Sequence, residues 1–99
     1  MGAGSPAFTI EGDDEVIQGP GRIDGGGGGG AGILVQGGAD NFILEGVEVT
    51  GWADGVELAG DVTSFKIVNN WIHSNAGHGL LVDANVDLYG IVTIEGSLF

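Results

Sequence analysis

The sequence has no cysteine and very few basic residues. Two lysine or arginine side chains are set against 14 carboxylates, and the formal net charge is −12 at pH 7. A surface this acidic repels phosphate backbones and anionic lipid headgroups, so the charge excludes nucleic acid and membrane as partners. The lack of cysteine excludes disulfides and thiolate metal sites. The chain also contains no apolar run of the ~18 residues that a membrane span requires.

Proline is scarce as well, with two residues, whereas glycine is abundant, with 22. The glycines lack the three-residue period and the proline content of collagen, which excludes a triple helix. Hydrophobic residues make up 42% of the chain, enough to form a core, so general disorder is also excluded. A length of 99 residues suits one domain. We predict a flexible N-terminal segment, 1–6, followed by a single domain, 7–99.

A short pattern that begins with glycine recurs along the chain. Residues 32–35 (Gly-Ile-Leu-Val) return as 55–58 (Gly-Val-Glu-Leu) and 79–82 (Gly-Leu-Leu-Val), after 23 and then 24 residues. That interval is typical of one coil of a solenoid. Within each copy the apolar residues alternate, which predicts a short strand with one inward face.

Two further alternating segments follow in each repeat. The inward positions of the first are Phe42 and Leu44, Phe65 and Ile67, and Val92 and Ile94. This segment ends where the backbone needs positive φ, at Gly46, Asn69 and Gly96, with Gly19 in a degenerate first repeat. In the second segment the inward positions are Ile23, Val49, Ile72 and Phe99, and the outward ones include Glu48 and Trp71.

These spacings predict an all-β fold. A coil of 23 or 24 residues leaves no room for the crossover helix of an ordinary parallel sheet, so the chain must wind. We predict a parallel β-helix of about four short coils, near 7–31, 32–54, 55–78 and 79–99, with three strands per coil. Stacking at ~4.8 Å per coil gives a height of roughly 19 Å. A small antiparallel sandwich is the alternative, but hairpins do not explain a fixed period near 23.

Two stretches interrupt the repeat. Residues 25–30 are all glycine, and we predict a mobile loop there. The run satisfies Gly-x-Gly-x-x-Gly, but a strand follows it, so no dinucleotide cradle is expected. Residues 83–90 are predicted to bulge outward, where binding sites on solenoids usually lie.

Several segments resemble a known family. Residues 64–75 and 77–82 resemble the coil of right-handed parallel β-helix proteins of the pectate-lyase-like superfamily, which has the pectin lyase fold. Residues 16–25 are similar to an early segment of polygalacturonase-type glycoside hydrolases. The resemblance covers residues 7–99 and implies a right-handed coil in a secreted or cell-surface protein. Members include lyases, hydrolases, esterases and epimerases of acidic polysaccharides, and also tailspikes and adhesins.

The catalytic set of polygalacturonase-like enzymes is not retained. Of their Asn-Thr-Asp motif only Asp54 is present, and no aspartate pair or Arg-x-Lys follows. The Gly-His-Gly motif matches around His78, but one coil too early. Asp54 and His78 should stack on one outer turn, where the carboxylate could orient the imidazole for acid or base chemistry or simply steady the turn. No nucleophile or second carboxylate is evident beside them, so we predict no catalytic site. We expect His73 to be exposed.

Two tryptophans are candidates for carbohydrate binding. Trp52 follows the third strand of its coil, and Trp71 is at an outward strand position. Solenoids that act on sugars often present aromatic faces on which pyranose rings stack. The alternative for both residues is packing under a loop or against a neighbouring chain, because aromatic residues are also enriched at interfaces.

Calcium is the cofactor for which the sequence offers candidates. Asp13, Asp14 and Glu15 are consecutive carboxylates in a turn, and carboxylate oxygens are calcium ligands. No EF-hand spacing is present, and carboxylates do not recur at equivalent coil positions. Solvated turn residues are the alternative, and we predict no metal site.

Together these observations predict a non-catalytic structural or carbohydrate-binding β-helix module. We expect it to be a fragment of a larger extracellular or cell-surface protein, with no signal peptide in this chain and polysaccharide as a possible partner. The alternative is a truncated polysaccharide-active enzyme, a hydrolase, lyase or epimerase with an incomplete site. Neither end carries a capping element, so we also expect end-to-end self-association through the uncapped coils.

Overall fold

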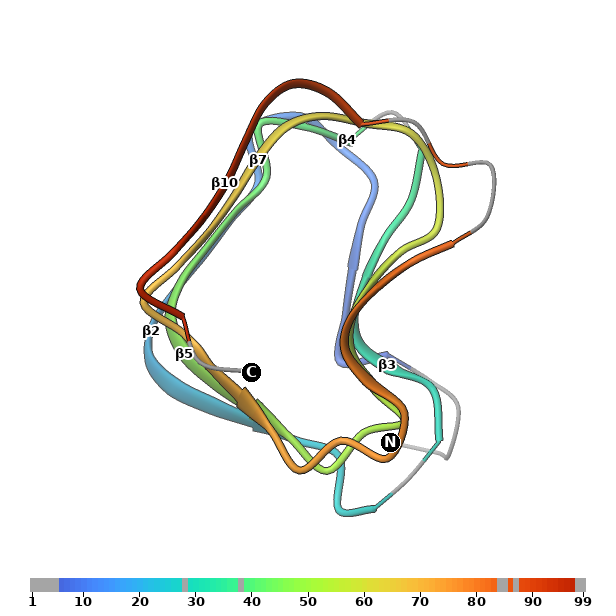
Figure 1. The fold of residues 1–99 in the computed structure, drawn as a ribbon, viewed down its shortest axis with the longest axis vertical. Coiled ribbons are helices and arrows are strands. Elements are labelled where there is room, and N and C mark those ends of the chain that lie inside the picture. The colour runs from blue at the N-terminus through green and yellow to red at the C-terminus, as the bar shows by residue number, and fades with distance from the viewer. Residues whose placement is uncertain (1–5, 28, 38, 84–85, 87, 98–99) are drawn as a thin grey trace.

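The structure, a computed structural model, is an all-β parallel β-solenoid of about three turns with 60% strand (Figure 1). It describes residues 6–27, 29–37, 39–83, 86 and 88–97. Most of the predicted N-terminal segment, 1–6, and the predicted inward position Phe99 therefore lie outside the described residues. In the described part of the chain, no helix is long and apolar enough to cross a membrane.

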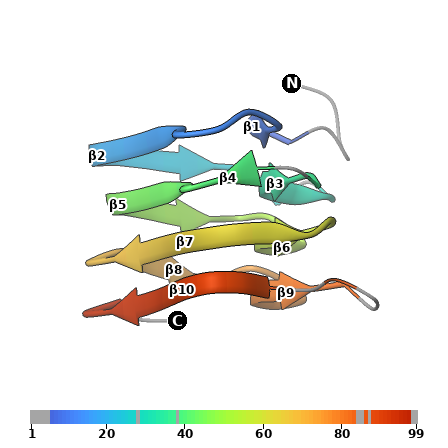
Figure 2. The same cartoon turned by 90° about the horizontal axis from the view of Figure 1, so that it is seen from above.

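Within the described residues, ten parallel strands form two sheets. They are β1 (Phe8–Ile10), β2 (Val16–Asp24), β3 (Ala31–Val35), β4 (Ala39–Asp40), β5 (Ile43–Thr50), β6 (Asp54–Leu58), β7 (Val62–Val68), β8 (Trp71–His73), β9 (His78–Val82) and β10 (Leu88–Glu95). One sheet has the order β1-β3-β6-β9, and the other has the order β10-β7-β5-β2, with β4 paired to β7 and β8 to β5. Figure 2 shows the coils stacked from β1 and β2 at one end to β9 and β10 at the other.

The predicted ladders are confirmed. Residues 33, 56 and 80 pair in succession through β3, β6 and β9. Leu44 pairs with Ile67, which pairs with Ile94 in the longer last coil. Val49 pairs with Ile23 on one side and with Ile72 on the other. Because equivalent residues stack, the alternation within each short strand carries through the whole solenoid.

The bends of the coil follow ladders of positive φ. Gly46, Asn69 and Gly96 adopt φ of 70°, 55° and 64°, as expected. Gly19 does not have positive φ. Instead the peptide bond from Gly19 to Pro20 is cis, and the register of β2 against β5 shifts between Gln18 and Gly21.

A further bend ladder was not predicted. It runs through Asp14, Asn41 and Ser64, with φ of 58°, 59° and 56°. The side chains of the first two are joined, since Asn41 Nδ2 donates to Asp14 Oδ1 at 3.0 Å. Aspartate, asparagine and serine stand where glycine would be expected, and asparagine and aspartate tolerate the left-handed region better than most residues.

The second and third predicted strands of a coil are not always separate. In the first two coils they form one long bent strand, β2 or β5, and only in the third do they divide, into β7 and β8. The bend at Gly46 lies within β5. The strand therefore continues around the corner, although Gly46 itself has no register partner there.

The core fills the interior of the coils. Its buried apolar side chains come from both sheets and include Ile33, Val35, Phe42, Leu44, Val49, Val56, Leu58, Val62, Phe65, Ile67 and Ile72. Figure 1 shows the strands enclosing this interior, with the sheet of β3 indented toward it. Each inward ladder contributes one side chain per coil, so a packed interior is built from strands of only two to nine residues.

The glycine run makes backbone hydrogen bonds to the next coil, and its predicted mobility stays a prediction. The Gly25 and Gly27 amides donate to the carbonyls of Thr50 and Gly51, both at 2.9 Å. The Gly30 carbonyl accepts from the Ala53 amide at 3.0 Å. These contacts hold the described part of the run against the turn that contains Trp52.

The ends of the solenoid are open in the described residues. β1 and β9 are the outermost strands of one sheet, and β2 and β10 those of the other, so each has a paired strand on one side only. The molecule measures 33 × 26 × 19 Å, with the shortest dimension along the stack, as the coil spacing predicts. Self-association through these edges stays a prediction.

Candidate functional site

The candidate site is built on the outer face of β2, β5 and β8. Arg22 pairs in register with Glu48, and Glu48 pairs with Trp71. These positions alternate with the inward ladder of Val49, so the strand geometry directs all three side chains outward. Trp71 is 51% exposed, the largest exposed aromatic side chain among the described residues. The predicted outward position of Trp71 is confirmed.

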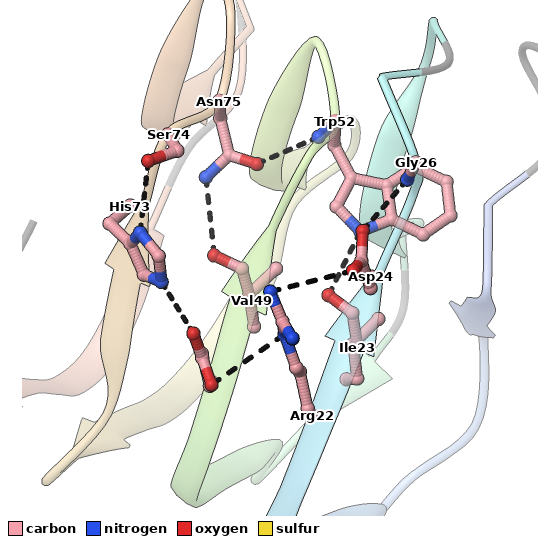
Figure 3. Close-up of polar contacts among 10 residues, drawn as sticks. Arg22, Ile23, Asp24, Gly26, Val49, Trp52, His73, Ser74 and Asn75 are labelled. Atoms are coloured by element: carbon pink, nitrogen blue, oxygen red, sulfur yellow. Dashed lines mark hydrogen bonds and ion pairs between the residues drawn. The ribbon is translucent and has the colours of Figure 1, made fainter.

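His73 is not simply exposed, as the sequence suggested. Its ring stacks on Trp71 with centroids 3.8 Å apart and planes 19° apart. Its Nε2 lies 2.6 Å from Glu48 Oε2, and its Nδ1 lies 3.0 Å from Ser74 Oγ (Figure 3). An ionised carboxylate only accepts, so Nε2–H donates to Glu48, while Nδ1 is in hydrogen-bond contact with the Ser74 hydroxyl. His73 therefore fixes the position of Trp71.

The Arg22 guanidinium is shared between two carboxylates. Its Nη2 lies 3.5 Å from Asp24 Oδ2, and its Nε lies 3.7 Å from Glu48 Oε1. Both contacts are long and solvated, so they hold the guanidinium loosely. They nevertheless place its positive charge between two negative ones, and Arg22 adds no net positive charge to this face.

A shallow recess, largely open to solvent, adjoins Trp71 at the corner of the coils. Its volume is about 330 Å³. Its lining includes Pro20, Gly46, Glu48, Asn69, Trp71 and Gly96. Ligand sites are usually hollows with some apolar surface and a few polar groups, and their volumes begin near ~300 Å³. This recess offers the Trp71 indole, the Glu48 carboxylate and the exposed Asn69 amide, which suits a ligand that has both a flat apolar face and polar groups.

Trp52, the other candidate for carbohydrate binding, is buried. It is 5% exposed, and its indole Nε1 donates to the Ile23 carbonyl at 3.3 Å. A Cβ on Gly25 would lie 2.6 Å from the ring, and one on Gly32 would lie 2.9 Å from it. The indole therefore packs under the glycine-rich turn, the alternative that the sequence left open, and it presents no face to a ligand.

Two asparagines that the sequence analysis passed over hold the bends beside the site. Asn70 accepts from the Val47 amide at 3.0 Å and donates to the Leu44 carbonyl at 2.9 Å. Asn75 accepts from the Trp52 amide at 3.0 Å and donates to the Val49 carbonyl at 3.3 Å (Figure 3). Each asparagine follows a positive-φ residue of its own coil and satisfies backbone groups of the previous coil. Each asparagine accepts from a backbone amide 23 residues earlier in the chain. This separation equals one repeat of the sequence, so the repeat could have pointed to both residues.

Asp54 and His78 are adjacent, as predicted. They pair in register between β6 and β9, and Asp54 Oδ1 accepts from His78 Nδ1 at 3.0 Å and from its amide at 3.0 Å. The imidazole is 61% exposed. The sequence suggested no second carboxylate beside this pair, but Glu57 lies close enough to Asp83 and Asp54 for both to raise its pKa.

The pKa of Glu57 is raised from 4.5 to about 6. The largest cause is its hydrogen bond with Asp83, followed by partial burial and by the negative charges of Asp83 and Asp54. At pH values between these two pKa values, the folded state therefore binds the proton more tightly than the unfolded state. The free energy of unfolding should therefore fall as pH rises through this window. We expect a fall of about 1 kcal/mol, because solvent screens a partly exposed pair.

The Glu57→Gln variant tests this expectation, because its neutral amide can still donate to Asp83. Urea unfolding at a series of pH values should show the fall in the wild-type chain and a flatter profile in the variant. The variant should also be the more stable of the two near neutral pH. Equal slopes in both proteins would contradict the expectation.

The metal candidates do not converge on a site. Asp14 occupies a bend, where its carboxylate accepts from Asn41 Nδ2. No group of three or more His, Asp or Glu side chains that could hold a metal ion is found among the described residues, which include Asp13, Asp14 and Glu15. The Asp14 carboxylate is thus engaged with the neighbouring coil, and the expectation of no metal site stays a prediction.

Comparison with protein-family models, with curated proteins and with solved structures found no match. The fold and the site define the chain as a parallel β-solenoid with an aromatic recess on its outer face.

Proposed function

We propose that this chain is a non-catalytic β-solenoid module that binds carbohydrate at the recess beside Trp71. The observation that carries the proposal is the half-exposed indole, fixed by its stack on His73, at the edge of a hollow of about 330 Å³. An aromatic ring held in place offers contact area with little further loss of conformational entropy on binding. The rest of the solenoid serves as the rigid support of this face.

Carbohydrate fits the recess better than a purely apolar ligand. A pyranose ring has a face of C–H groups, which stacks on an indole, and a rim of hydroxyls, which need hydrogen-bonding partners. Glu48 and Asn69 line the same recess and supply acceptors and a donor for such a rim. The combination of one flat apolar surface with a few polar groups is the general plan of small-molecule sites.

The proposal extends to family and location. The resemblance of residues 16–25 and 64–82 to the pectate-lyase-like superfamily supports a right-handed coil and a parent protein that is secreted or on the cell surface. Many solenoids of that superfamily meet polysaccharides outside the cell. A carbohydrate-binding module derived from such a coil needs an exposed aromatic face and no complete catalytic set.

The second candidate is a polysaccharide-active enzyme whose site is incomplete in this chain. It is favoured by the group formed by Asp54, Glu57, His78 and Asp83, in which one carboxyl has a raised pKa, as general acids often do. The two candidates differ in measurable output, since the enzyme releases products. A reducing-end assay and an assay for unsaturated products distinguish them.

Substitution at Trp71 tests the proposed function. A panel of neutral, uronic and amino polysaccharides should contain at least one ligand, and Trp71→Ala should weaken its binding ~10-fold or more, which corresponds to about 1.4 kcal/mol. Trp71→Phe keeps an aromatic face and should retain most of the affinity. Affinity electrophoresis followed by calorimetry measures both. Binding that is equally strong in Trp71→Ala would remove the recess from consideration.

A further inference from the structure

Glu48 is the carboxylate of the recess. It lines the hollow together with Trp71 and is its register partner on the adjacent strand. One oxygen accepts from His73 at 2.6 Å, and the other is 3.7 Å from the Arg22 guanidinium. A carboxylate has about four acceptor positions. Glu48 therefore retains capacity for another donor while its position is already fixed.

The charge around the recess is negative. No lysine or arginine belongs to the lining of the recess in the described part of the chain. The guanidinium nearest to Glu48, that of Arg22, also contacts Asp24, and the other basic residue, Lys66, is on β7. The chain as a whole carries −12. An anionic sugar would approach a negative surface on which the nearest cation, Arg22, already lies between two carboxylates.

We infer that the saccharide bound at this recess is an amino sugar with a free, protonated amine. This inference rests on the proposed carbohydrate-binding function and names its ligand class. The ammonium group donates charge-assisted hydrogen bonds to Glu48, while the sugar ring stacks on Trp71. An ammonium near an indole face gains cation–π attraction as well. Uronic acids, the ligands that the family resemblance implies, are disfavoured at the same recess.

A matched pair of oligosaccharides tests the inference. Glucosamine tetramer and its fully N-acetylated counterpart have the same backbone, and only the first carries amines that can be protonated. Calorimetry at about pH 6 keeps an ordinary carboxylate ionised and most of the amines protonated, and ~0.1 M salt screens distant charges. We expect the wild-type chain to bind the amine form ~10-fold more tightly than the acetylated form. Galacturonate tetramer should bind more weakly than either.

Glu48→Gln should bring the two affinities within ~2-fold of each other by weakening only the amine form. Glu11→Gln is the matched control, because it removes one carboxylate from an exposed position beyond β1. That variant should keep the wild-type preference. Tetralysine tests for attraction by charge alone. It should bind weakly, and Trp71→Ala should not change its affinity.

Four results would overturn the inference. They are equal or tighter binding of the acetylated form, an unchanged preference in Glu48→Gln, an equal loss of both ligands in that variant, and tetralysine binding as tight as that of the amine form. The first two leave the proposed function intact, provided that Trp71→Ala still weakens saccharide binding by ~10-fold or more. Saccharide binding that is equally strong in Trp71→Ala instead defeats the proposed function, so the two failures are distinguishable.

Discussion

Replacing Trp52 by alanine should destabilise the solenoid by about 3–5 kcal/mol, the usual cost of truncating a large buried aromatic side chain. The indole is 5% exposed and fills the space between the glycine-rich turn and the next coil. Its truncation also removes the hydrogen bond to the Ile23 carbonyl. The turn cannot collapse onto the vacated space without breaking the hydrogen bonds that the Gly25 and Gly27 amides donate to the carbonyls of residues 50 and 51.

The two tryptophans form a matched pair for this experiment. Trp71→Ala removes the same side chain from an exposed position, where only one face is packed, on His73. We expect this variant to lose about 1 kcal/mol, the scale of a single aromatic stack. Urea unfolding followed by circular dichroism avoids the loss of the fluorescent probe. Equal losses in the two variants would show that Trp52 is not structurally buried.

The regular part of the fold was predictable because residues one repeat apart in the sequence lie next to each other in the stacked coils. A residue such as Val56 pairs with the residue one coil before it and one coil after it, so a period near 23 fixes its neighbours. Strand alternation then decides which face is inward. The ladders, the outward position of Trp71 and the contact of Asp54 with His78 all follow from these two facts alone.

The turns were less predictable, because alternation does not extend into them. Trp52 follows Gly51, which has a φ of 78°, so its side-chain direction cannot be counted from the strand. Its burial could be inferred only from the glycines at 25 and 32, which leave space for a ring. Within the glycine run, Gly25 packs against this ring, whereas Gly26, Gly27 and Gly29 face open space, and the mobility of the run stays a prediction.

The network of His73 was missed for a different reason. Its register partner is Thr50, whereas its contacts are with Trp71, two residues away on the same face, and Glu48, diagonally across the strands. Diagonal neighbours lie within reach of long side chains. Ladders of register partners alone do not report such contacts. The Glu57 group was overlooked similarly, because Asp83 lies just beyond the strand that contains its register neighbours.

Replacing Asn70 by alanine should cost about 2–4 kcal/mol, although the side chain is small. Asn70 is buried and joins two backbone groups of the previous coil, the Val47 amide and the Leu44 carbonyl. Alanine leaves one donor and one acceptor without these partners at the bend, and each such loss costs about 1–3 kcal/mol when the group is buried. The bend at Gly46 cannot satisfy these two groups by strand pairing, because the backbone turns away from its neighbour there.

The adjacent Asn69 provides the control for this prediction. It is exposed, and glycine adopts its φ of 55° without a steric penalty. Asn69→Gly should therefore change the free energy of unfolding by less than about 1 kcal/mol. A loss in Asn70→Ala no larger than that in Asn69→Gly would mean that water can replace both hydrogen bonds. The expected difference means that the buried side-chain amide of Asn70 stabilises the corner more than Asn69, the residue with positive φ, does.

Ser97 supports this assignment, because it has the same role one coil later. Its hydroxyl accepts from the Asn70 backbone amide at 3.1 Å and donates to the Ile67 carbonyl at 3.4 Å.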